Sequence, residues 1–570
     1  MIHYSVRCDA PHTHTLDVRV RFEAQGDTRV HLPSWTPGSY LLREFGRYVS
    51  RMRVTTEAGE AIDASQTAKG SWAFHADGPV EVAYRIYGHE LTVRTPHVDG
   101  THAFFTGTNA CVFVDGRTDE PCTLQLHAPD GWETFCPLDR DAEGAFVAPD
   151  YDVLADTIVE LGPHRSHTFD VLGVPHHLVF WGADDVALDL PRLERDVRAI
   201  VEVNAAIFDG ALPYEHYLFV FHITDKARGG LEHLNATALA TPWRYFETDE
   251  GYRSMLGLIA HEHFHTWNVK RIRPVALGPF DYLNENYSTG LWVAEGFTSY
   301  FDNLVCLRAG CWTRDEYLAA LQRDIRNMLR VPGRFEQSIA DASYDAWIRL
   351  YRPDEDTPNR TVSYYLKGSI AALALDLHVR GETRGERSLV DVMRWLWARF
   401  QATGEGFTDD DMRDAFREAC GVDVDAELDA WVFGTEDPPL AALFASHGIA
   451  WAAEDGDQPY LGLRTSTQGQ DLVVKHVLTD GPNAGTNLYA GDVLVAVDGR
   501  RITPATWSAR CDALVEDHAH ALHVFRRGRL VETELRAAPD PGYAVNLAFA
   551  EESTDAERAL LEEWLAGSLS

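Results

Sequence analysis

One apolar segment, residues 256–268, constrains this chain more than any other stretch of its sequence. The segment contains the motif H-E-x-x-H, with His261, Glu262 and His265 in its fixed positions. On an α-helix, positions i and i+4 lie about 400° apart, so the two histidines project from one face, one turn apart. Two imidazoles in that arrangement can bind one tetrahedral zinc ion, and the intervening glutamate can deprotonate a water on the metal. The motif therefore predicts a helix that carries a zinc site.

The motif can also arise by chance, because the chain contains 25 histidines. A composition of this kind gives a random HExxH in roughly 7% of chains. The surroundings favour zinc: Ile259, Phe264 and Trp267 predict a buried helix, which Pro274 should close. Burying two histidines and a glutamate without a ligand would strand polar groups at a high cost in free energy. We therefore predict one zinc ion per chain.

A zinc peptidase needs a third protein ligand and leaves one metal position open for water. Downstream of the motif, residues 291–300 form an apolar segment that is interrupted by a single carboxylate, Glu295. This glutamate could face the metal from a neighbouring helix. Taken alone, it is equally typical of a helix N-terminus, where the helix dipole stabilises an acidic side chain.

The chain divides into segments of different periodicity. Residues 15–22 and 80–86 alternate polar and apolar, and turn residues punctuate the rest of the first 170 positions, as in a β-sandwich. From about residue 185 the pattern becomes helical, with a capping box at Thr313 and Glu316. The predicted fold class is multidomain α+β, with a β-sandwich-like domain over 1–170 and a mainly helical domain over 171–450.

A second boundary is predicted near residue 450, where the Gly/Pro-rich segment 434–439 and the acidic run 454–457 follow one another. Short strands then resume within residues 451–540, and residues 522–525 and 530–533 should form a hairpin. The remaining residues, 541–570, are interpreted as a tail with an amphipathic helix that begins at the capping box Thr554 and Glu557.

Composition excludes some classes of partner. The chain has 51 basic and 87 acidic residues, a net charge of −36, which argues against nucleic acid or an anionic membrane as its partner. A membrane span needs about 18 uninterrupted apolar residues, and no stretch of the chain approaches that length. Residues 1–7 lack the features of a secretion signal. We expect a cytoplasmic protein. Its eight cysteines form no CxxC pair, which indicates reduced thiols rather than a metal or redox motif.

The extended metal motif, residues 261–274, together with residues 292–298, resembles the glycyl aminopeptidase family, PDZ-containing gluzincins related to aminopeptidase N. Residues 35–43 resemble the amino-terminal domain of that family. The resemblance covers nearly the whole chain and implies that residues 171–450 form a thermolysin-like zinc peptidase domain and 451–540 a PDZ-like domain. It also implies that His261, His265 and Glu295 are the zinc ligands. Glu295 follows His265 by 30 positions, so the intervening loop is longer than in the broader aminopeptidase N group.

The resemblance carries two further roles over to the chain, those of Glu232 and Tyr365. Gly229, Gly230 and Glu232 belong to a segment similar to the Gly-x-Met-Glu-Asn strand of aminopeptidases, which implicates Glu232 in binding the free α-amine of the substrate. The segment departs from that pattern in two residues, and Glu232 could instead be an ordinary exposed turn acid. Residues 365–368 resemble a Tyr-x-Lys-Gly segment, which implies that the Tyr365 phenol stabilises the oxyanion. Its alternative is a core tyrosine, and Tyr364 is adjacent.

Residues 460–463, 481–485 and 490–494 resemble a PDZ domain, whose Φ-Gly-Φ loop receives the C-terminus of a peptide. A structural module that never binds peptide is the alternative. His222, His233 and His263 lie near the motif in sequence but receive no role.

The sequence thus predicts a zinc aminopeptidase acting on peptides, and the family suggests small N-terminal residues, glycine and alanine. Two other interpretations remain open. One is a zinc endopeptidase guided by the PDZ-like module, and the other is a peptide-binding scaffold with an inert zinc site. Intact His261, Glu262, His265, Glu295 and Tyr365 argue against the scaffold.

Overall fold

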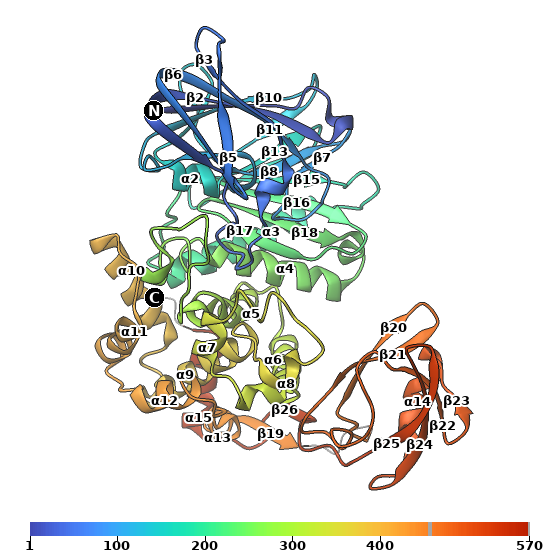
Figure 1. The fold of residues 1–570 in the computed structure, drawn as a ribbon. Helices are drawn as coiled ribbons and strands as arrows, with labels where there is room; N and C mark the ends of the chain where they lie inside the picture. The colour runs from blue at the N-terminus through green and yellow to red at the C-terminus, as the bar shows by residue number, and fades with distance from the viewer. Residues whose placement is uncertain (454–458, 568–570) are drawn as a thin grey trace.

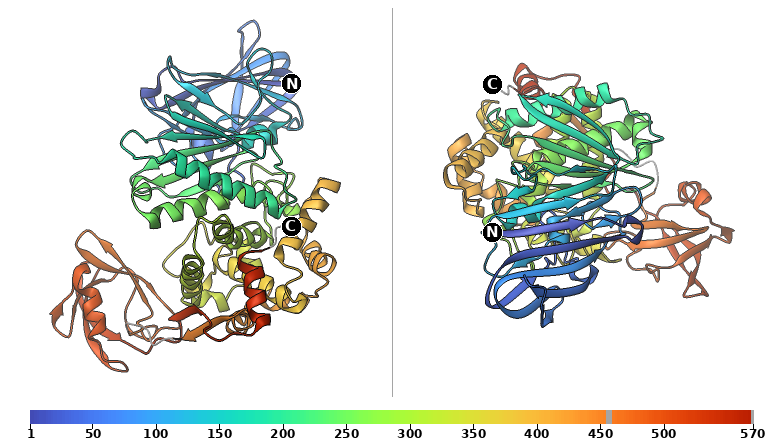
Figure 2. Two further views of the ribbon diagram at one scale, coloured as in Figure 1. Left: turned by 180° about the vertical axis from the view of Figure 1, so that it is seen from behind. Right: turned by 90° about the horizontal axis from the view of Figure 1, so that it is seen from above.

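The computed structural model describes residues 1–453 and 459–567 (Figure 1). A β-rich region at the N-terminus is followed by a middle region that combines a sheet with many helices, and a smaller β domain stands to one side of the helices (Figures 1 and 2). The multidomain α+β fold class predicted from the sequence is confirmed at this level.

Two sheets build the N-terminal region. Strands β2 (Thr15–His31) and β6 (Ser71–Tyr87) pair antiparallel over their full length, and they contain the two alternating segments that the sequence marked. The other strands of this nine-stranded sheet are β1 (Ile2–Arg7), β3 (Val49–Thr56), β4 (Ala61–Ile62), β5 (Ala64–Ala68), β9 (Phe113–Val114), β10 (Cys122–His127) and β12 (Phe146–Ala148). The four-stranded sheet consists of β7 (His97–Val98), β8 (Ala103–Thr106), β11 (Glu133–Phe135) and β13 (Ile158–Gly162), with helices α1 (Gly107–Ala110) and α2 (Tyr151–Asp156) alongside. Both sheets contribute to one apolar core.

The middle region starts with a five-stranded sheet in the order β14-β15-β16-β18-β17. Its strands are β14 (Arg165–Val171), β15 (Val174–Trp181), β16 (Tyr217–Thr224), β17 (Gly229–Glu232) and β18 (Ala236–Pro242). The predicted boundary at 170 therefore lies inside β14 and is too late. The sequence also indicated only helix beyond 185, which misses three strands. Strand β16 packs Phe219 and Phe221 against the helices and Leu218 and Val220 against the opposite side, so a sheet buried on both faces shows no alternation.

Helices cover one face of this sheet and form the layer below it (Figure 1). They are α3 (Leu190–Ile207), α4 (Asp249–Phe264), α5 (Thr298–Arg308), α6 (Arg314–Leu329), α7 (Ile339–Tyr344), α8 (Thr357–Arg360), α9 (Leu366–Thr383), α10 (Leu389–Thr403), α11 (Asp409–Ala415), α12 (Asp425–Trp431) and α13 (Leu440–Ala445). Short 3₁₀ turns lie at Trp243–Phe246, Val275–Leu277 and Pro332–Phe335, and π-helical turns at Trp292–Phe297 and Phe416–Cys420. The capping box at Thr313 and Glu316 is confirmed at the start of α6. Helix α4 ends at Phe264, so the prediction that Pro274 closes it is wrong.

The C-terminal β domain is built on a sheet in the order β20-β21-β22-β24-β25. Its elements are β20 (Leu463–Gln468), β21 (Asp471–Val477), β22 (Val493–Val497), β23 (Arg500–Arg501), α14 (Trp507–Asp512), β24 (Ala519–Arg526) and β25 (Arg529–Arg536). The predicted hairpin is confirmed as the pair β24 and β25. Asn359, at the end of α8, holds the domain to the helices: its amide donates to Val477 O at 2.9 Å and accepts from Thr479 N at 2.9 Å. The acidic run 454–457, on which the second boundary partly depended, lies outside the described residues.

The last residues of the chain return to the helical layer. Strand β26 (Val545–Phe549) pairs with β19 (Ile449–Ala453), and helix α15 (Asp555–Leu565) begins at the predicted capping box. Trp564 and Leu565 of α15 are buried in the core of the middle region. Residues 541–567 therefore contribute to that core, and their interpretation as a tail is wrong. In the part of the chain that the structure describes, no helix is both long and apolar enough to span a membrane. All eight cysteines carry free thiols.

Candidate active site

Helix α4 carries the HExxH motif in its last turn. Its N-terminus is capped by Thr248, whose hydroxyl accepts a hydrogen bond from Gly251 N. His261 lies in the last turn and His265 immediately follows it, still in helical conformation, with its N–H bonded to His261 O at 3.2 Å. The imidazole centroids are therefore only 4.6 Å apart, as the motif predicted.

Glu295 reaches the two histidines from the neighbouring π-helical turn, Trp292–Phe297, which leads directly into α5. A π turn inserts a residue into a helix and re-aims the side chains around it, and such turns are frequent at functional sites. Glu295 Oε2 lies 3.5 Å from His261 Nε2 and 3.2 Å from His265 Nε2. The structure thus brings together all three residues predicted as metal ligands.

The other nitrogen of each imidazole has a hydrogen-bond acceptor. His265 Nδ1 lies 2.7 Å from Asn268 O, and because a carbonyl can only accept, Nδ1 carries the proton. His261 Nδ1 lies 3.0 Å from the Asp302 carboxylate, which again is an acceptor. In the neutral rings, both Nε2 atoms therefore present lone pairs towards Glu295. Carboxylate and carbonyl partners of this kind orient metal-binding histidines in proteins.

These three donors fit a zinc ion. Without a cation, two nitrogen lone pairs and a carboxylate oxygen would face one another, and Glu295 Oε2 has no hydrogen-bond partner among the described residues. Although burial disfavours its charge, the imidazoles of His265 and His261 hold the pKa of Glu295 well below its usual range. Zinc bonds of 2.0–2.1 Å in a tetrahedron place ligand atoms about 3.3 Å apart, and the two observed nitrogen–oxygen separations are 3.2 and 3.5 Å.

Glu262 projects from the same turn of α4 beside the metal donors. Burial raises its pKa to about 7, and its Oε2 has no hydrogen-bond partner among the described residues. Gly230 of β17 lies directly against this carboxylate: a Cβ atom at Gly230 would be 2.1 Å from Glu262 Oε1. The Arg94 guanidinium from the N-terminal region donates to Gly230 O at 2.9 Å and thereby holds the strand in place.

Glu232, at the end of β17, is buried, with 3% of its surface exposed, so the alternative of an exposed turn acid is wrong. Its carboxylate, the Glu262 carboxylate and an imidazole nitrogen of His265 lie within 4.8 Å of one another. A loop of the N-terminal region covers it: a Cβ atom at Gly38, where φ is +85°, would be 2.4 Å from Glu232 Oε1. Gly229 begins the strand with φ +148°, and a Cβ atom there would meet no heavy atom within 4 Å.

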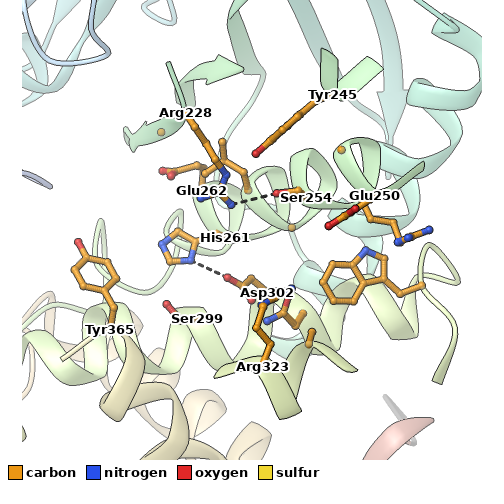
Figure 3. Close-up of a pocket in the computed structure, with 18 of the residues that line it drawn as sticks. Arg228, Tyr245, Glu250, Ser254, His261, Glu262, Ser299, Asp302, Arg323 and Tyr365 are labelled. Atoms are coloured by element: carbon orange, nitrogen blue, oxygen red, sulfur yellow. Dashed lines mark hydrogen bonds and ion pairs between the residues drawn. The ribbon is translucent and has the colours of Figure 1, made fainter. Parts of the chain in front are cut away.

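Of the two adjacent tyrosines, Tyr365 lines the cavity that contains the metal donors, whereas Tyr364 is fully buried and does not (Figure 3). The Tyr365 hydroxyl is 3.1 Å from that of Tyr351. Burial, followed by the nearby Glu295 charge, raises the pKa of Tyr365 well above its usual value, so the phenol keeps its proton. The structure therefore assigns the place facing the donors to the tyrosine that spacing favoured.

The cavity has a volume of about 880 Å³ and extends from the metal donors along α4. Figure 3 shows Tyr365 at one end and Tyr245 and Glu250 at the other, with His261 and Glu262 between them. Sequence reasoning missed Asp302, Tyr351, Arg94 and Gly38, because no local pattern marks these positions.

The three histidines without a predicted role lie outside this cavity. His263 bonds Asn204 Nδ2 at 3.0 Å and Tyr214 OH at 2.7 Å in the core. His233 Nδ1 bonds Asp156 O, and His222 Nε2 lies 2.9 Å from the Glu160 carboxylate. Glu160 also accepts from His102 Nδ1 at 2.9 Å and from His164 Nε2 at 2.7 Å. These separations are those of hydrogen bonds to one central carboxylate, and they join the N-terminal region to β16.

The sheet, the helix α4 and the converging donors define a metallopeptidase. Comparisons with known proteins specify it further: the model of the M61 glycyl aminopeptidase family matches residues 254–371, and the model of the M61 N-terminal domain matches residues 3–163. Two separate parts of the chain are thus similar to the M61 glycyl aminopeptidase family. The resemblance drawn from the sequence is confirmed.

A solved structure, described as an aminopeptidase N family protein from Idiomarina loihiensis, is similar over 99% of this chain and 100% of its own, with 29% identity and a TM-score of 0.94. An M1 zinc metallopeptidase from Deinococcus radiodurans, solved as a mutant with a Tyr-Ser-Ala substrate, matches 77% of this chain and 94% of its own, with 16% identity and a TM-score of 0.48. A comparison with curated proteins finds no match.

Proposed function

We propose that the protein is a zinc-dependent aminopeptidase that removes N-terminal residues from peptides. One observation carries this proposal. Glu232 is a buried carboxylate, its Oε1 has no partner among the described residues, and it lies beside the general-base candidate Glu262 and the metal donor His265. A buried carboxylate without a cationic partner is costly, and the ammonium group of a peptide N-terminus would satisfy it.

His261, His265 and Glu295 would hold the zinc ion. When bound, zinc supplies a Lewis acid that polarises a carbonyl and lowers the pKa of water. Asp302 and Asn268 keep the two histidines in the tautomer that presents Nε2. This part of the site is common to aminopeptidases and endopeptidases.

The proton movements fall to residues of the chain itself. Glu262, which is buried beside the metal donors, takes a proton from the attacking water and passes it to the leaving amine. The neutral Tyr365 phenol donates a hydrogen bond to the oxyanion that develops on the scissile carbonyl. Gly230 leaves the space that the Glu262 carboxylate occupies.

The decisive experiment removes the amine anchor. We expect Glu232→Gln to lower kcat/KM for a free-amine peptide by roughly 10- to 100-fold, the value of a hydrogen bond to a charged group, while the acetylated peptide, a poor substrate from the start, changes little. Glu250→Gln is the matched control, because it removes the same charge from the far end of the same cavity. The zinc content of each variant is measured alongside. An unchanged ratio of free to acetylated substrate in Glu232→Gln would favour the endopeptidase and reject the proposal.

Three finer assignments belong to the same proposal. The preference for glycine and alanine is supported by the family and by Gly38, which packs against Glu232 and restricts the space beside the amine. The middle region is proposed to be thermolysin-like. The C-terminal β domain is proposed to be PDZ-like, with residues 461–463 leading into β20 as its carboxylate-binding loop.

A further inference from the structure

The far end of the active-site cavity concentrates positive charge in a chain whose net charge is −36. Four arginines line it: Arg228, Arg244, Arg253 and Arg323. Arg228 precedes β17 and Arg323 belongs to α6, and Figure 3 shows these two on opposite sides of the row formed by Glu262, His261 and Asp302. Because the two arginines come from separate elements, their meeting in one cavity is a property of the fold.

Two of the four arginines already have acidic partners. Arg253 pairs with Glu316 at 2.7 Å, and Arg323 with Asp324 at 3.3 Å. Arg228 and Arg244 have none: within residues 1–453 and 459–567, no carboxylate lies within ion-pair distance of either. Arg228 donates a hydrogen bond to the Ser254 hydroxyl at 3.4 Å, and Arg244 donates to the carbonyl of Asp225 at 3.1 Å and lies 5.6 Å from the centroid of the Tyr245 ring.

Glu250, in the first turn of α4, is an acid at this end of the cavity that pairs with no basic side chain among the described residues. The N-terminus of that helix offers unpaired N–H groups and a partial positive charge, and these offset an acidic side chain in the first turn. Asp302 also lines the cavity, but its carboxylate is hydrogen-bonded to His261 Nδ1 at 3.0 Å, so Arg228 and Arg244 remain the arginines at this end without an ion pair among the described residues.

Strand β17 and helix α4 form two walls of the cavity that run in the same direction. Arg228 contacts Ser254, Gly230 lies against Glu262, and Glu232 lies near His265, so the order of residues along the strand follows the order along the helix. β17 is at the edge of its sheet, and an extended peptide beside it would have its amine at Glu232 and its C-terminus towards Arg228.

The distance between these ends sets the length of such a peptide. Ser254, the contact of Arg228, precedes His261 by seven residues, about 10 Å along the helix axis. A guanidinium binds a carboxylate at about 3 Å, which leaves about 7 Å from the scissile carbonyl to the substrate carboxylate. An extended chain covers about 3.4 Å per residue, so two residues beyond the scissile bond span the gap.

We propose that Arg228 binds the C-terminal carboxylate of the substrate, which makes short peptides of three or four residues the substrate class of this site. The inference rests on the proposed aminopeptidase function and adds a second anchor to it. Glu232 fixes the N-terminus, Arg228 fixes the C-terminus, and the peptide bond after the first residue lies over the metal donors. A dipeptide is too short to reach both anchors.

The test compares trialanine with trialanine amide, using zinc-loaded full-length protein. The net negative charge of the chain repels an anion, so without a dedicated site the amide should be at least as good a substrate as the acid. The proposal expects the opposite: kcat/KM for the acid exceeds that for the amide by about tenfold, the factor of one charge-assisted hydrogen bond. In Arg228→Gln this acid/amide ratio should fall towards one.

Lys226→Gln is the matched control. It removes the same charge from the same loop, but Lys226 is exposed and does not line the cavity, so the acid/amide ratio should stay as in the wild type. Equal rates for acid and amide in the wild type, or a ratio that survives in Arg228→Gln, would overturn the inference while leaving the aminopeptidase intact. If neither peptide is cleaved by the zinc-loaded protein, the proposed function itself fails and the inference falls with it.

Discussion

Replacing Gly230 by alanine should inactivate the enzyme without unfolding it. A Cβ atom at this position would be 2.1 Å from Glu262 Oε1, whereas ordinary contacts begin at 3.4 Å. The carboxylate must therefore move by about 1.3 Å, the difference between these two distances. A misplacement of about 1 Å at a reacting group costs on the order of 10²-fold in rate. We expect kcat/KM to fall by about 10²-fold, equivalent to about 2.7 kcal/mol of transition-state stabilisation.

The free energy of unfolding should change less than the activity, because the atoms in the way are the carboxylate and Cγ of one flexible side chain, Glu262. Gly230 does not have a positive φ, so alanine fits its backbone conformation, and the loss of freedom in the unfolded chain favours alanine by about 0.4–1 kcal/mol. The three heavy atoms nearest to a Cβ at Gly230 all belong to Glu262 and none to a proposed zinc ligand. Thermal melting and zinc content should consequently stay near those of the wild type.

Gly257→Ala provides the matched control. Gly257 lies in α4 and lines the same cavity, but a Cβ atom there would be 3.7 Å from the Trp312 ring, an ordinary contact. Alanine in a helix interior should raise the stability by up to about 1 kcal/mol and leave turnover in place. Wild-type kcat/KM in Gly230→Ala would refute the reasoning, and so would a loss of zinc or of folding that tracks the loss of activity.

Two further predictions follow from the same contacts. Tyr365→Phe should lower kcat by about 10²-fold with little change in KM, as for the loss of one oxyanion donor. Tyr364→Phe should change kcat little, because the Tyr364 hydroxyl has no partner among the described residues and lies outside the cavity. Steady-state kinetics of both variants test this prediction. Burial lowers the pKa of His176 from 6.5 to about 4, so its stabilising contribution is complete above pH 6.5 and is lost as the pH falls, when the unfolded chain takes up a proton that the folded chain does not. Between about pH 7.5 and pH 5 this amounts to about 2 kcal/mol, and denaturant titrations at both pH values should show a smaller loss in His176→Gln; an equal loss would exclude His176 as the source.

The features that the sequence predicted well are those encoded by short spacings. The i, i+4 histidines had to share one helical face, and the capping boxes at Thr313 and Thr554 had to start helices. Strand β16 was not predicted, because it is buried on both faces and its sequence therefore has no periodicity of two. Strand β26 and helix α15 resemble a tail in sequence because nothing local indicates that they return to the middle region, where Val545 pairs with Ala453 and Trp564 bonds Tyr300.

In the candidate site, too, residues that act together but lie far apart in the sequence could not be predicted. Asp302 is 41 residues from the histidine that it orients, and a single aspartate at such a distance has no signature in sequence. Glu232 and Tyr365 were found only through resemblance to a family, since neither spacing nor composition points to them. The cavity arginines were missed because guanidinium groups scattered over several elements become one positive surface only after folding.

The N-terminal region completes the catalytic geometry. All three proposed zinc ligands lie between residues 261 and 295, so the middle region alone contains the candidate metal site. The position of the general base, however, depends on Gly230, whose carbonyl is held by Arg94, and the amine anchor Glu232 is packed against Gly38. Both Arg94 and Gly38 come from the N-terminal region.

A buried network of one carboxylate and two imidazoles joins the N-terminal region to the middle region. Glu160 and His102 of the N-terminal region and His222 of β16 are fully buried, and both imidazoles bond the same carboxylate. A buried carboxylate is costly without its partners, so a displacement between the regions that broke either hydrogen bond to Glu160 would cost stability. A rigid joint of this kind is what the site requires, because a shift of about 1 Å between β17 and α4 would separate the amine anchor from the scissile bond on which turnover depends.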